Sequence, residues 1–270
     1  MTPQTSAGTS QTGQIDPGLL LRVDNISVRF GGIVALDGVS FSMRKGSIVG
    51  LIGPNGAGKT TLFNCLSRLY QPSNGDIAFM GHSLLEEPRH RIAALGIGRT
   101  FQNLALFPRM SVLDNVMVGR HCRTSSGFFV NSLRIPSVMR EEQDTLAKAH
   151  NLIKLLELEQ VAGTRVMDLP FGTQKRVELA RALAAEPKLL LLDEPASGLN
   201  HEEVHSLGRL IRDIRDRLSL TVLLVEHHMT LVMSISDRVV ALNFGKKIAE
   251  GTPAELQKHP EVIQAYLGDA

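Results

Sequence analysis

The sequence predicts an α/β fold built on a mostly parallel sheet, and two observations support this. Two short runs, at 189–192 and 221–225, are apolar except for Thr221, as central strands covered on both faces are. A helical pattern at 202–217 lies between them and would make the crossover that parallel strands need. With 270 residues and 43% hydrophobic side chains, the chain is long enough to bury such a core in one large domain.

The start of the chain predicts a leader followed by antiparallel strands. Residues 1–18 are rich in Thr, Gln, Ser and Gly and lack the basic and apolar parts of a secretory signal, which predicts a disordered N-terminal leader. The folded domain is then expected at 19–270. Apolar Ile26, Val28 and Phe30 alternate with other residues before Gly31-Gly32, a pattern typical of a half-buried strand and a turn. We therefore expect an antiparallel β subdomain here.

The middle and the end of the chain differ in their periodicity. Strand signals are absent from about 84 to 163, where apolar residues at helical spacing predict an α-helical subdomain. Within it, 124–136 has no clear period and predicts an irregular connection, either packed on the subdomain or open to a partner. Apolar segments on both sides of Asn243-Phe244-Gly245 indicate a hairpin. A hairpin and a C-terminal helix are expected over about 238–267.

Charge and cysteine content argue against several classes of function. The net charge of +2 creates no field that would attract nucleic acid, so no nucleic-acid partner is expected. The apolar runs are far shorter than the roughly 20 residues that span a bilayer. The two cysteines, Cys65 and Cys122, are far apart and have no metal-like spacing, which favours a reducing cytoplasm.

The strongest motif is a glycine-rich loop of the form G-x-x-x-x-G-K-[ST], placed between an apolar run at 47–52 and a helical pattern at 61–69. Glycines let backbone N–H groups surround a phosphate, and a helix start adds its positive end. Lys59 would reach the phosphate oxygens, and the Thr60 hydroxyl would bind Mg²⁺. The motif predicts a P-loop NTPase that uses ATP and Mg²⁺. The expected nucleotide-binding residues are Gly53, Pro54, Asn55, Gly56, Ala57, Gly58, Lys59, Thr60 and Thr61.

A second motif is the pair of acids, Asp193 and Glu194, at the end of the apolar run at 189–192. This is the edge of a parallel sheet where α/β folds bind ligands. Beside a phosphate loop, Asp193 would hold the metal and Glu194 would orient or deprotonate the attacking water. Taken alone, both acids could equally cap the loop after the strand.

Over about 21–267 the chain resembles the nucleotide-binding subunits of ABC transporters, an ABC ATPase fold. Gln102, in RTFQN, is similar to the family's Q-loop glutamine, which implies contact with Mg²⁺ and sensing of the γ-phosphate. His227 matches the switch histidine, which implies a contact with the γ-phosphate and a part in placing the water. Phe30 stands where the family has an aromatic ring stacked on adenine.

Each of these three residues also has a plainer interpretation. Phe30 shares its alternation with buried-type residues and could belong to the core. Gln102 could be a solvated polar side chain. Either His227 or His228 could face inward, and His227 is chosen because the motif puts the histidine directly after the glutamate.

The segment LPFGTQ at 169–174 aligns with the family signature LSGGQ, but Pro170 replaces the serine and Phe171 the first glycine. The resemblance implies phosphate contacts from Gly172 and Thr173. A plain helix start would account for the segment without any ligand. The D-loop position at 197–200 likewise ends in asparagine where the family has aspartate.

Longer stretches, including RTFQNLALFPRMSVLDNV, DEPASGLN and VEHHMTLVMSISDRV, are most similar to one ATPase of the high-affinity branched-chain amino acid importers. This resemblance implies an ATP-hydrolysing subunit that forms a head-to-tail dimer with a second ABC ATPase subunit. It also implies two transmembrane permease subunits, an indirect link to a solute-binding protein, and a peripheral place on the cytoplasmic face of the cell membrane. Residues 104–110 would then form the groove for a permease coupling helix.

Three alternatives stay open. Importers for urea, amides or other small organic solutes share much of this pattern. A non-transport ABC ATPase of DNA repair or translation would carry paired domains or a long coiled-coil insertion, and neither pattern is visible. A different phosphate-loop enzyme, such as a small-molecule kinase, would not need Gln102, the signature segment and His227 in this order.

Overall fold

The computed structural model describes residues 16–101, 104–123 and 136–267. The predicted leader therefore lies outside the described residues up to position 15, as does the irregular connection predicted at 124–136, except for Pro136. The strands are β1 (Leu19–Phe30), β2 (Ile33–Arg44), β3 (Ile48–Ile52), β4 (Asn74–Phe79), β5 (His82–Ser83), β6 (Ile97–Arg99), β7 (Leu189–Asp193), β8 (Thr221–Val225), β9 (Arg238–Asn243) and β10 (Lys246–Gly251).

These strands form two sheets. A four-stranded antiparallel sheet has the order β2-β1-β4-β5, which confirms the antiparallel subdomain expected near the start of the chain. A six-stranded sheet has the order β10-β9-β3-β8-β7-β6. In it β9, β3, β8, β7 and β6 are parallel, and β10 returns antiparallel to β9 as the predicted hairpin. Every residue of β3, β7 and β8 is buried, so the two apolar runs are central strands as predicted.

Nine α-helices and several short 3-10 turns complete the described part of the chain. The 3-10 turns are Leu84–Glu86, Arg89–Arg91, His121–Arg123, Glu159–Val161 and Val166–Asp168. The helices are α1 (Lys59–Leu66), α2 (Ile92–Leu95), α3 (Val112–Val118), α5 (Pro136–Leu155), α6 (Phe171–Ala184), α7 (His201–Leu218), α8 (Met229–Ile235), α9 (Pro253–Leu256) and α10 (Pro260–Leu267).

The six-stranded sheet separates two hydrophobic cores. Because successive side chains of a strand point to opposite faces, each apolar strand supplies both cores. Ile48 and Leu190 belong to the core that includes α7 and α8, whereas Val49 and Leu191 belong to the core shared with α1 and the antiparallel sheet. This two-sided burial holds the carboxyl ends of β3, β7 and β8 at one edge, where the motifs lie.

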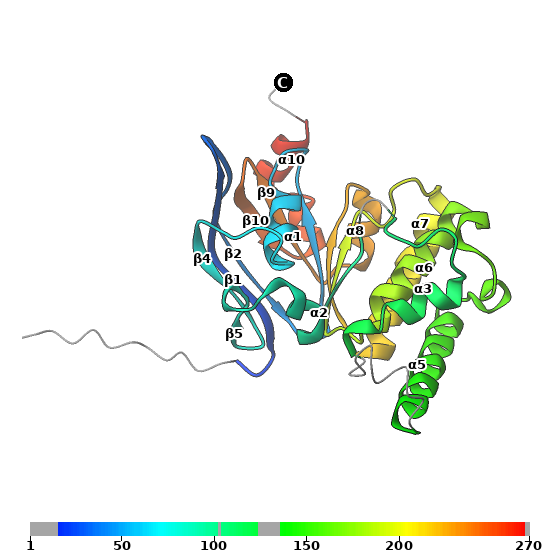
Figure 1. The fold of residues 1–270 in the computed structure, drawn as a ribbon. Coiled ribbons are helices and arrows are strands. Elements are labelled where there is room, and N and C mark those ends of the chain that lie inside the picture. Colours follow the sequence, from blue (N-terminus) through cyan, green and yellow to red (C-terminus); the bar gives the residue numbers. More distant parts are fainter. Residues whose placement is uncertain (1–15, 102–103, 124–135, 268–270) are drawn as a thin grey trace, which may run out of the picture.

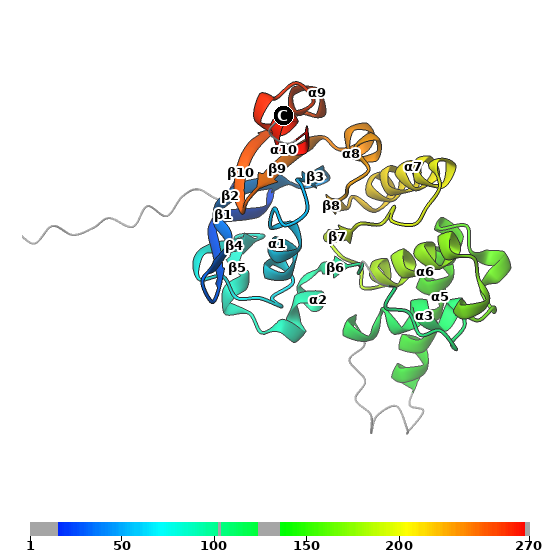
Figure 2. The same ribbon diagram turned by 90° about the horizontal axis from the view of Figure 1, so that it is seen from above.

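Helices α3, α5 and α6 pack on one another and form a lobe beside the sheets (Figures 1 and 2). The expectation that about 84–163 contains no strand is wrong at Ile97–Arg99, which pairs in parallel with β7. This strand has only three residues with Gly98 in the middle, so it has no apolar alternation to detect. Helix α6, which packs against α3, lies beyond 163. Within the described ranges, no helix is long and apolar enough to cross a membrane.

Candidate active site

The loop between β3 and α1 turns at glycines that no other residue could replace without strain. Gly53 has a φ of 150°, and a Cβ there would collide with the carbonyl oxygen of Leu242. Gly58 has a φ of 102°, and a Cβ there would lie 2.7 Å from the carbonyl oxygen of Ala35. Residues that carry a side chain rarely adopt these backbone conformations. The loop backbone is therefore pressed against β9 on one side and β2 on the other.

Lys59 is buried at the start of α1 and reaches back into this loop. Its Nζ donates hydrogen bonds to the carbonyl oxygens of Gly53, at 2.6 Å, and Pro54, at 2.9 Å. Burial lowers the pKa of Lys59, while the negative charges of Glu194 and Asp193 act in the opposite direction. An ammonium group so placed gains a strong partner when a phosphate enters the loop. Of the other loop residues, Gly53 and Ala57 are buried, Pro54, Gly58 and Thr61 are half-buried, and Asn55, Gly56 and Thr60 are exposed.

Asp193 ends β7 and is almost completely buried. Its Oδ2 pairs with Arg99 at 2.9 Å, and Arg99 also donates to Asn64 Oδ1 and Ser67 Oγ, both at 2.9 Å. The guanidinium group therefore joins β6, β7 and α1 at one point. Sequence reasoning missed Arg99, because these contacts join residues that are far apart in the chain.

Glu194 and His227 follow neighbouring parallel strands and meet in space. The Nε2 atom of His227 lies 2.8 Å from Oε1 of Glu194. Glu194 also donates its backbone N–H to the carbonyl oxygen of Val225, at 2.9 Å. Its φ of 48° is in the left-handed region, which non-glycine residues adopt at some energetic cost and often at functional sites. Of the two candidate histidines, His227 is thus the one that the structure places against the acid.

Glu226, which sequence reasoning also missed, is a carboxylate with 1% of its surface exposed. Its Oε1 accepts a hydrogen bond from the N–H of Ala196, at 2.6 Å. Its Oε2 accepts from the N–H groups of His227, at 3.0 Å, and His228, at 3.3 Å. One buried side chain thus ties the segment after β7 to the segment after β8. The signal in the sequence was an acid placed between an apolar strand and two histidines.

Phe30 lies on the surface, and the alternative that it belongs to the core is wrong. Ile26 and Val28 are buried, but Phe30 is 46% exposed. Phe30 is the last residue of β1 and pairs with Ile33, which is also exposed, so this end of the hairpin lies outside the core. The rings of Phe30 and Tyr70 pack edge to face, with centroids 5.1 Å apart and planes at 72°. Phe30 is thus an exposed aromatic ring whose known partner is another aromatic ring.

Residues 36–197, more than half of the chain, match the model of the ABC transporter family. The chain belongs to the ABC transporter family. The resemblance drawn from its motifs is thereby confirmed, together with the α/β fold of an ABC ATPase. Residues 246–270 also match the model described as branched-chain amino acid ATP-binding cassette transporter.

Individual relatives are similar over almost the whole chain. The high-affinity branched-chain amino acid transport ATP-binding protein LivG of Salmonella typhimurium is 43% identical, over 93% of this chain and 98% of LivG. The corresponding protein BraF of Pseudomonas aeruginosa is 41% identical over the same shares. An ATP-binding cassette of an ABC transporter, solved in its ADP conformation, has a TM-score of 0.81 at 30% identity, covering 93% of this chain and 99% of that one.

The predicted Q-loop glutamine of this ABC ATPase, Gln102, lies outside the described residues. Both flanks of the segment are held by α6. The N–H of Phe101 donates to Glu178 Oε1 at 3.1 Å, and Arg181 donates to the carbonyl oxygen of Ala105. Burial raises the pKa of the Glu178 carboxyl. The segment that joins the sheet to the helical lobe is therefore tied to the same helix that carries the signature.

The predicted signature segment forms the start of α6, and the structure places both residues that depart from the family pattern. Pro170 is the N-cap of the helix and supplies no side-chain hydrogen bond. The Phe171 ring packs so closely on Gly198 that a Cβ there would lie 2.9 Å from the ring. Lys175 Nζ lies 5.5 Å from the centroid of the same ring. Phe171 thus links the signature to the D-loop of the same chain.

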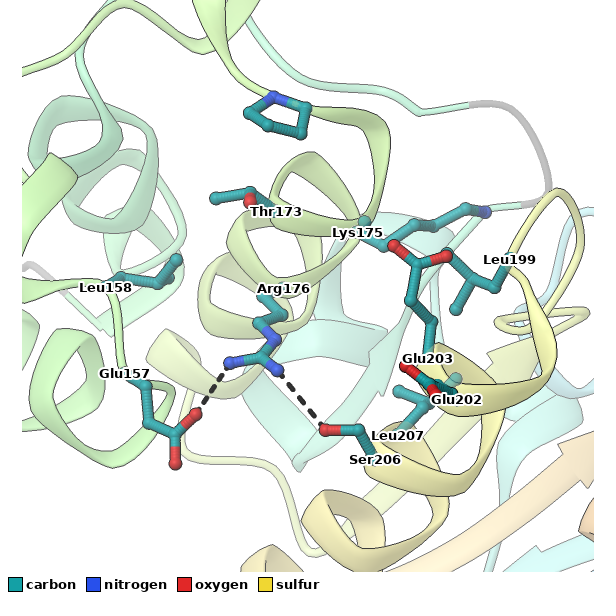
Figure 3. A pocket seen from close by; sticks show the side chains of 12 residues that line it. Glu157, Leu158, Thr173, Lys175, Arg176, Leu199, Glu202, Glu203, Ser206 and Leu207 are labelled. Carbon is teal, nitrogen blue, oxygen red and sulfur yellow. Dashed lines mark hydrogen bonds and ion pairs between the residues drawn. The ribbon is translucent and has the colours of Figure 1, made fainter.

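The other two signature residues line a cleft between α6 and α7. Gly172 and Thr173 are half-buried there. Gly172 is close to the start of α7, since a Cβ on it would lie 2.8 Å from Glu203 Oε1. Arg176 crosses the cleft, with hydrogen bonds to Glu157 Oε2 at 2.8 Å and Ser206 Oγ at 3.3 Å (Figure 3). The volume of the cleft is about 450 Å³. These contacts fix the start of α6 against α7.

Asn200, which replaces the usual D-loop aspartate, is the N-cap of α7. Its Oδ1 accepts from the N–H of Glu203 at 3.0 Å, and Glu203 Oε2 accepts from the N–H of Asn200 at 2.9 Å. This reciprocal pair is a capping box, which asparagine forms as well as aspartate does. Both ribbon views place α6, and with it the signature, in the helical lobe and α1 in the lobe of the sheets (Figures 1 and 2).

Proposed function

We propose that this chain binds and hydrolyses ATP as a subunit of an ABC importer for branched-chain or related hydrophobic amino acids. The observation that carries the proposal is the contact between Glu194 Oε1 and His227 Nε2, at 2.8 Å. Glu194 is also close enough to Lys59 for its negative charge to act on the pKa of Lys59. A buried ammonium group, a carboxylate and an imidazole at one edge of a parallel sheet suit phosphoryl transfer to water. The solute class is supported by the names of LivG and BraF.

The nucleotide would be held by residues from two parts of the fold. Its phosphates would lie in the loop 53–61 against backbone N–H groups and Lys59, and its adenine would stack on Phe30. Mg²⁺ would take oxygen ligands from Asp193, the Thr60 hydroxyl and the Gln102 amide. Such a set fits the ion, because Mg²⁺ prefers oxygen ligands, uses one or two carboxylates and completes its shell with phosphates and waters. When bound, the ion would neutralise charge that develops on the phosphates.

The reaction needs a positioned water molecule. Glu194 would accept a proton from that water while the water oxygen forms a bond to the γ-phosphorus and the bond to the bridging β–γ oxygen breaks. His227 would contact the γ-phosphate and help to hold the water in line. The products are ADP and inorganic phosphate.

A second ATPase chain would complete the site. Gly172 and Thr173 lie on the helical lobe, whereas the phosphate loop lies on the lobe of the sheets. A head-to-tail dimer would therefore bring the signature of one chain to the nucleotide bound by the other chain. Two permease subunits would dock on 104–110, where Phe107 is 47% exposed. The subunit would then sit on the cytoplasmic face of the membrane, with a solute-binding protein acting indirectly through the permeases and no nucleic acid involved.

The phosphate loop can be tested first on the isolated chain. We expect Lys59→Ala to weaken ATP binding by about 10- to 100-fold, since a charge-assisted hydrogen bond contributes about 1.5–3 kcal/mol. Titration calorimetry would measure the affinity, with Lys258→Ala, an exposed lysine near the C-terminal helix, as the control. Equal affinities of Lys59→Ala and the wild type would contradict the phosphate-loop assignment.

The solute class needs the assembled transporter. The chain would be co-expressed with the permease subunits and the second ATPase chain and reconstituted in vesicles with the solute-binding protein. ATP-dependent uptake of labelled leucine supports the proposed solute, and uptake of urea or an amide in its place supports the alternative. Association with DNA or ribosomes, and never with permeases, would defeat the transporter assignment.

A further inference from the structure

The C-terminal helix reaches the phosphate loop through one tyrosine. The hydroxyl oxygen of Tyr266, near the end of α10, accepts a hydrogen bond from the backbone N–H of Gly53 at 2.7 Å. The carbonyl oxygen of Gly53 in turn accepts a hydrogen bond from Lys59 Nζ at 2.6 Å. Gly53 is therefore held between the C-terminal helix and the lysine of the loop.

The N–H of Gly53 needs this acceptor. The parallel ladder between β3 and β9 ends with the pair Ile52 and Ala241, so Gly53 lies just past the last paired residue of its strand. The backbone of Gly53 lies close to β9, where a Cβ on Gly53 would collide with the carbonyl oxygen of Leu242. Gly53 is buried, and a buried N–H without a partner costs about 1–3 kcal/mol. The tyrosine hydroxyl supplies the hydrogen-bond acceptor that the sheet does not provide at this position.

The C-terminal segment is anchored independently of the loop. Leu256 of α9 and Val262 of α10 are buried in the core beside α8. Between the loop residues 54–57 and the side of α10 that carries Glu261 and Gln264 there is a cavity of about 470 Å³. Tyr266 connects α10 to Gly53, the first residue of the loop, so a shift of α10 would change the hydrogen bond that holds Gly53.

The chemistry of the contact suits a fixed support. Burial raises the pKa of the Tyr266 hydroxyl, while the hydrogen bond from Gly53 acts in the opposite direction. The hydroxyl therefore stays neutral at physiological pH. A neutral phenol accepts the N–H without placing a negative charge beside a loop that is to receive phosphates.

We propose that Tyr266 is a positioning residue for the phosphate loop, and that through it helix α10 tunes the affinity for nucleotide. The proposal rests on the function proposed above. The hydroxyl holds Gly53 where the loop is ready to receive phosphates. A loop that spends part of its time in other conformations binds more weakly in proportion to the time lost.

The test compares Tyr266→Phe with the wild type in the full-length chain. Removing only the hydroxyl should weaken ATP and ADP binding about threefold to tenfold, as expected for one neutral hydrogen bond. Titration calorimetry without Mg²⁺ measures both affinities in the absence of turnover. In the ATPase assay KM should rise by the same factor, and kcat at saturation should not change, because the tyrosine hydroxyl bonds to the loop backbone, whereas Glu194 and His227 follow β7 and β8. Ile263→Ala, on the same helix with 42% exposure, is the matched control and should bind as the wild type does.

A second measurement separates positioning from general loss of structure. In a chain labelled with ¹⁵N-glycine, Tyr266→Phe should move the amide resonance of Gly53 without nucleotide and leave glycines distant from the loop in place. Unchanged affinity and an unmoved Gly53 resonance would overturn the role of Tyr266, and so would a fall in kcat at constant KM. A wild-type chain that binds no nucleotide would overturn the proposed function itself, so the two failures are distinguishable.

Discussion

His227 Nε2 and Glu194 Oε1 lie 2.8 Å apart because their strands are neighbours in the parallel sheet. The backbone on both sides is fixed: Glu194 donates its N–H to the last residue of β8, and Glu226 accepts the N–H of His227. The pair is thus set by the sheet and by one buried carboxylate, rather than by the two side chains alone. Its contribution to turnover can be separated from nucleotide binding.

Glu194→Gln should abolish most hydrolysis and leave ATP binding intact. The amide keeps the shape of the side chain but cannot accept a proton from water, a role worth about 100- to 10,000-fold in rate. Phosphate release would measure turnover and calorimetry the affinity, with the exposed Glu86→Gln as the control. Turnover at the wild-type rate would remove Glu194 from this role.

Glu226→Gln should lower both stability and turnover. Three backbone N–H groups converge on the carboxylate, and glutamine presents an NH₂ group to at least one of them. An unpaired buried donor costs about 1–3 kcal/mol, so the thermal midpoint should fall. Because His227 loses its backbone anchor, kcat should fall while the affinity for ATP holds. A variant with normal stability and normal kcat would show that the three hydrogen bonds to Glu226 are not needed to hold His227 in place.

Substitutions of Phe30 distinguish stacking from packing. Phe30→Tyr should preserve the affinity for ATP, because it keeps the aromatic face. Phe30→Leu should weaken the affinity several-fold without unfolding the chain, because the side chain is 46% exposed and contributes little to the core. Affinity and thermal midpoint are measured on both variants. A lower midpoint with unchanged affinity for Phe30→Leu would instead indicate a packing role.

The sequence was informative where function depends on neighbours in the chain. The loop at 53–61 could be predicted because its glycines, Lys59 and Thr60 are consecutive, and Asp193-Glu194 because they end an all-apolar strand. Both signals are local, and the structure places both motifs at the carboxyl ends of parallel strands.

Contacts between distant segments could not be predicted in this way. Tyr266 and Gly53 are 213 residues apart, and Arg99 and Asp193 are 94 apart. The spacing of residues along the chain does not indicate that the C-terminal helix contacts the phosphate loop. The order of the strands in the sheet brings these two segments together. Phe30 shows the same limit on a smaller scale, because its alternation with Ile26 and Val28 does not reveal that this end of the hairpin lies outside the core.

The two ATP sites of the assembled transporter should be unequal. Pro170 caps α6 with neither a hydroxyl nor an N–H, where the family's serine offers a hydrogen bond to the γ-phosphate of the partner's nucleotide. A hydrogen bond to a charged group contributes about 1.5–3 kcal/mol, so its loss should weaken that contact by about tenfold or more. The weak signature would face the phosphate loop of the partner. The loop 53–61, Glu194 and His227 of this chain would face the signature of the partner, which we expect to be intact.

The site built on Glu194 and His227 of this chain should therefore carry most of the hydrolysis. Reconstitution of both ATPase chains with the permeases allows Glu194→Gln to be compared with the equivalent change in the partner. Turnover and solute uptake should fall further with Glu194→Gln, because this change disables the site that has the stronger signature. Pro170→Ser should raise turnover at the other site, since it restores a hydroxyl at the start of α6 while Phe171 keeps its packing on Gly198. Equal losses from the two glutamate changes, or a larger loss from the partner's, would contradict the asymmetry.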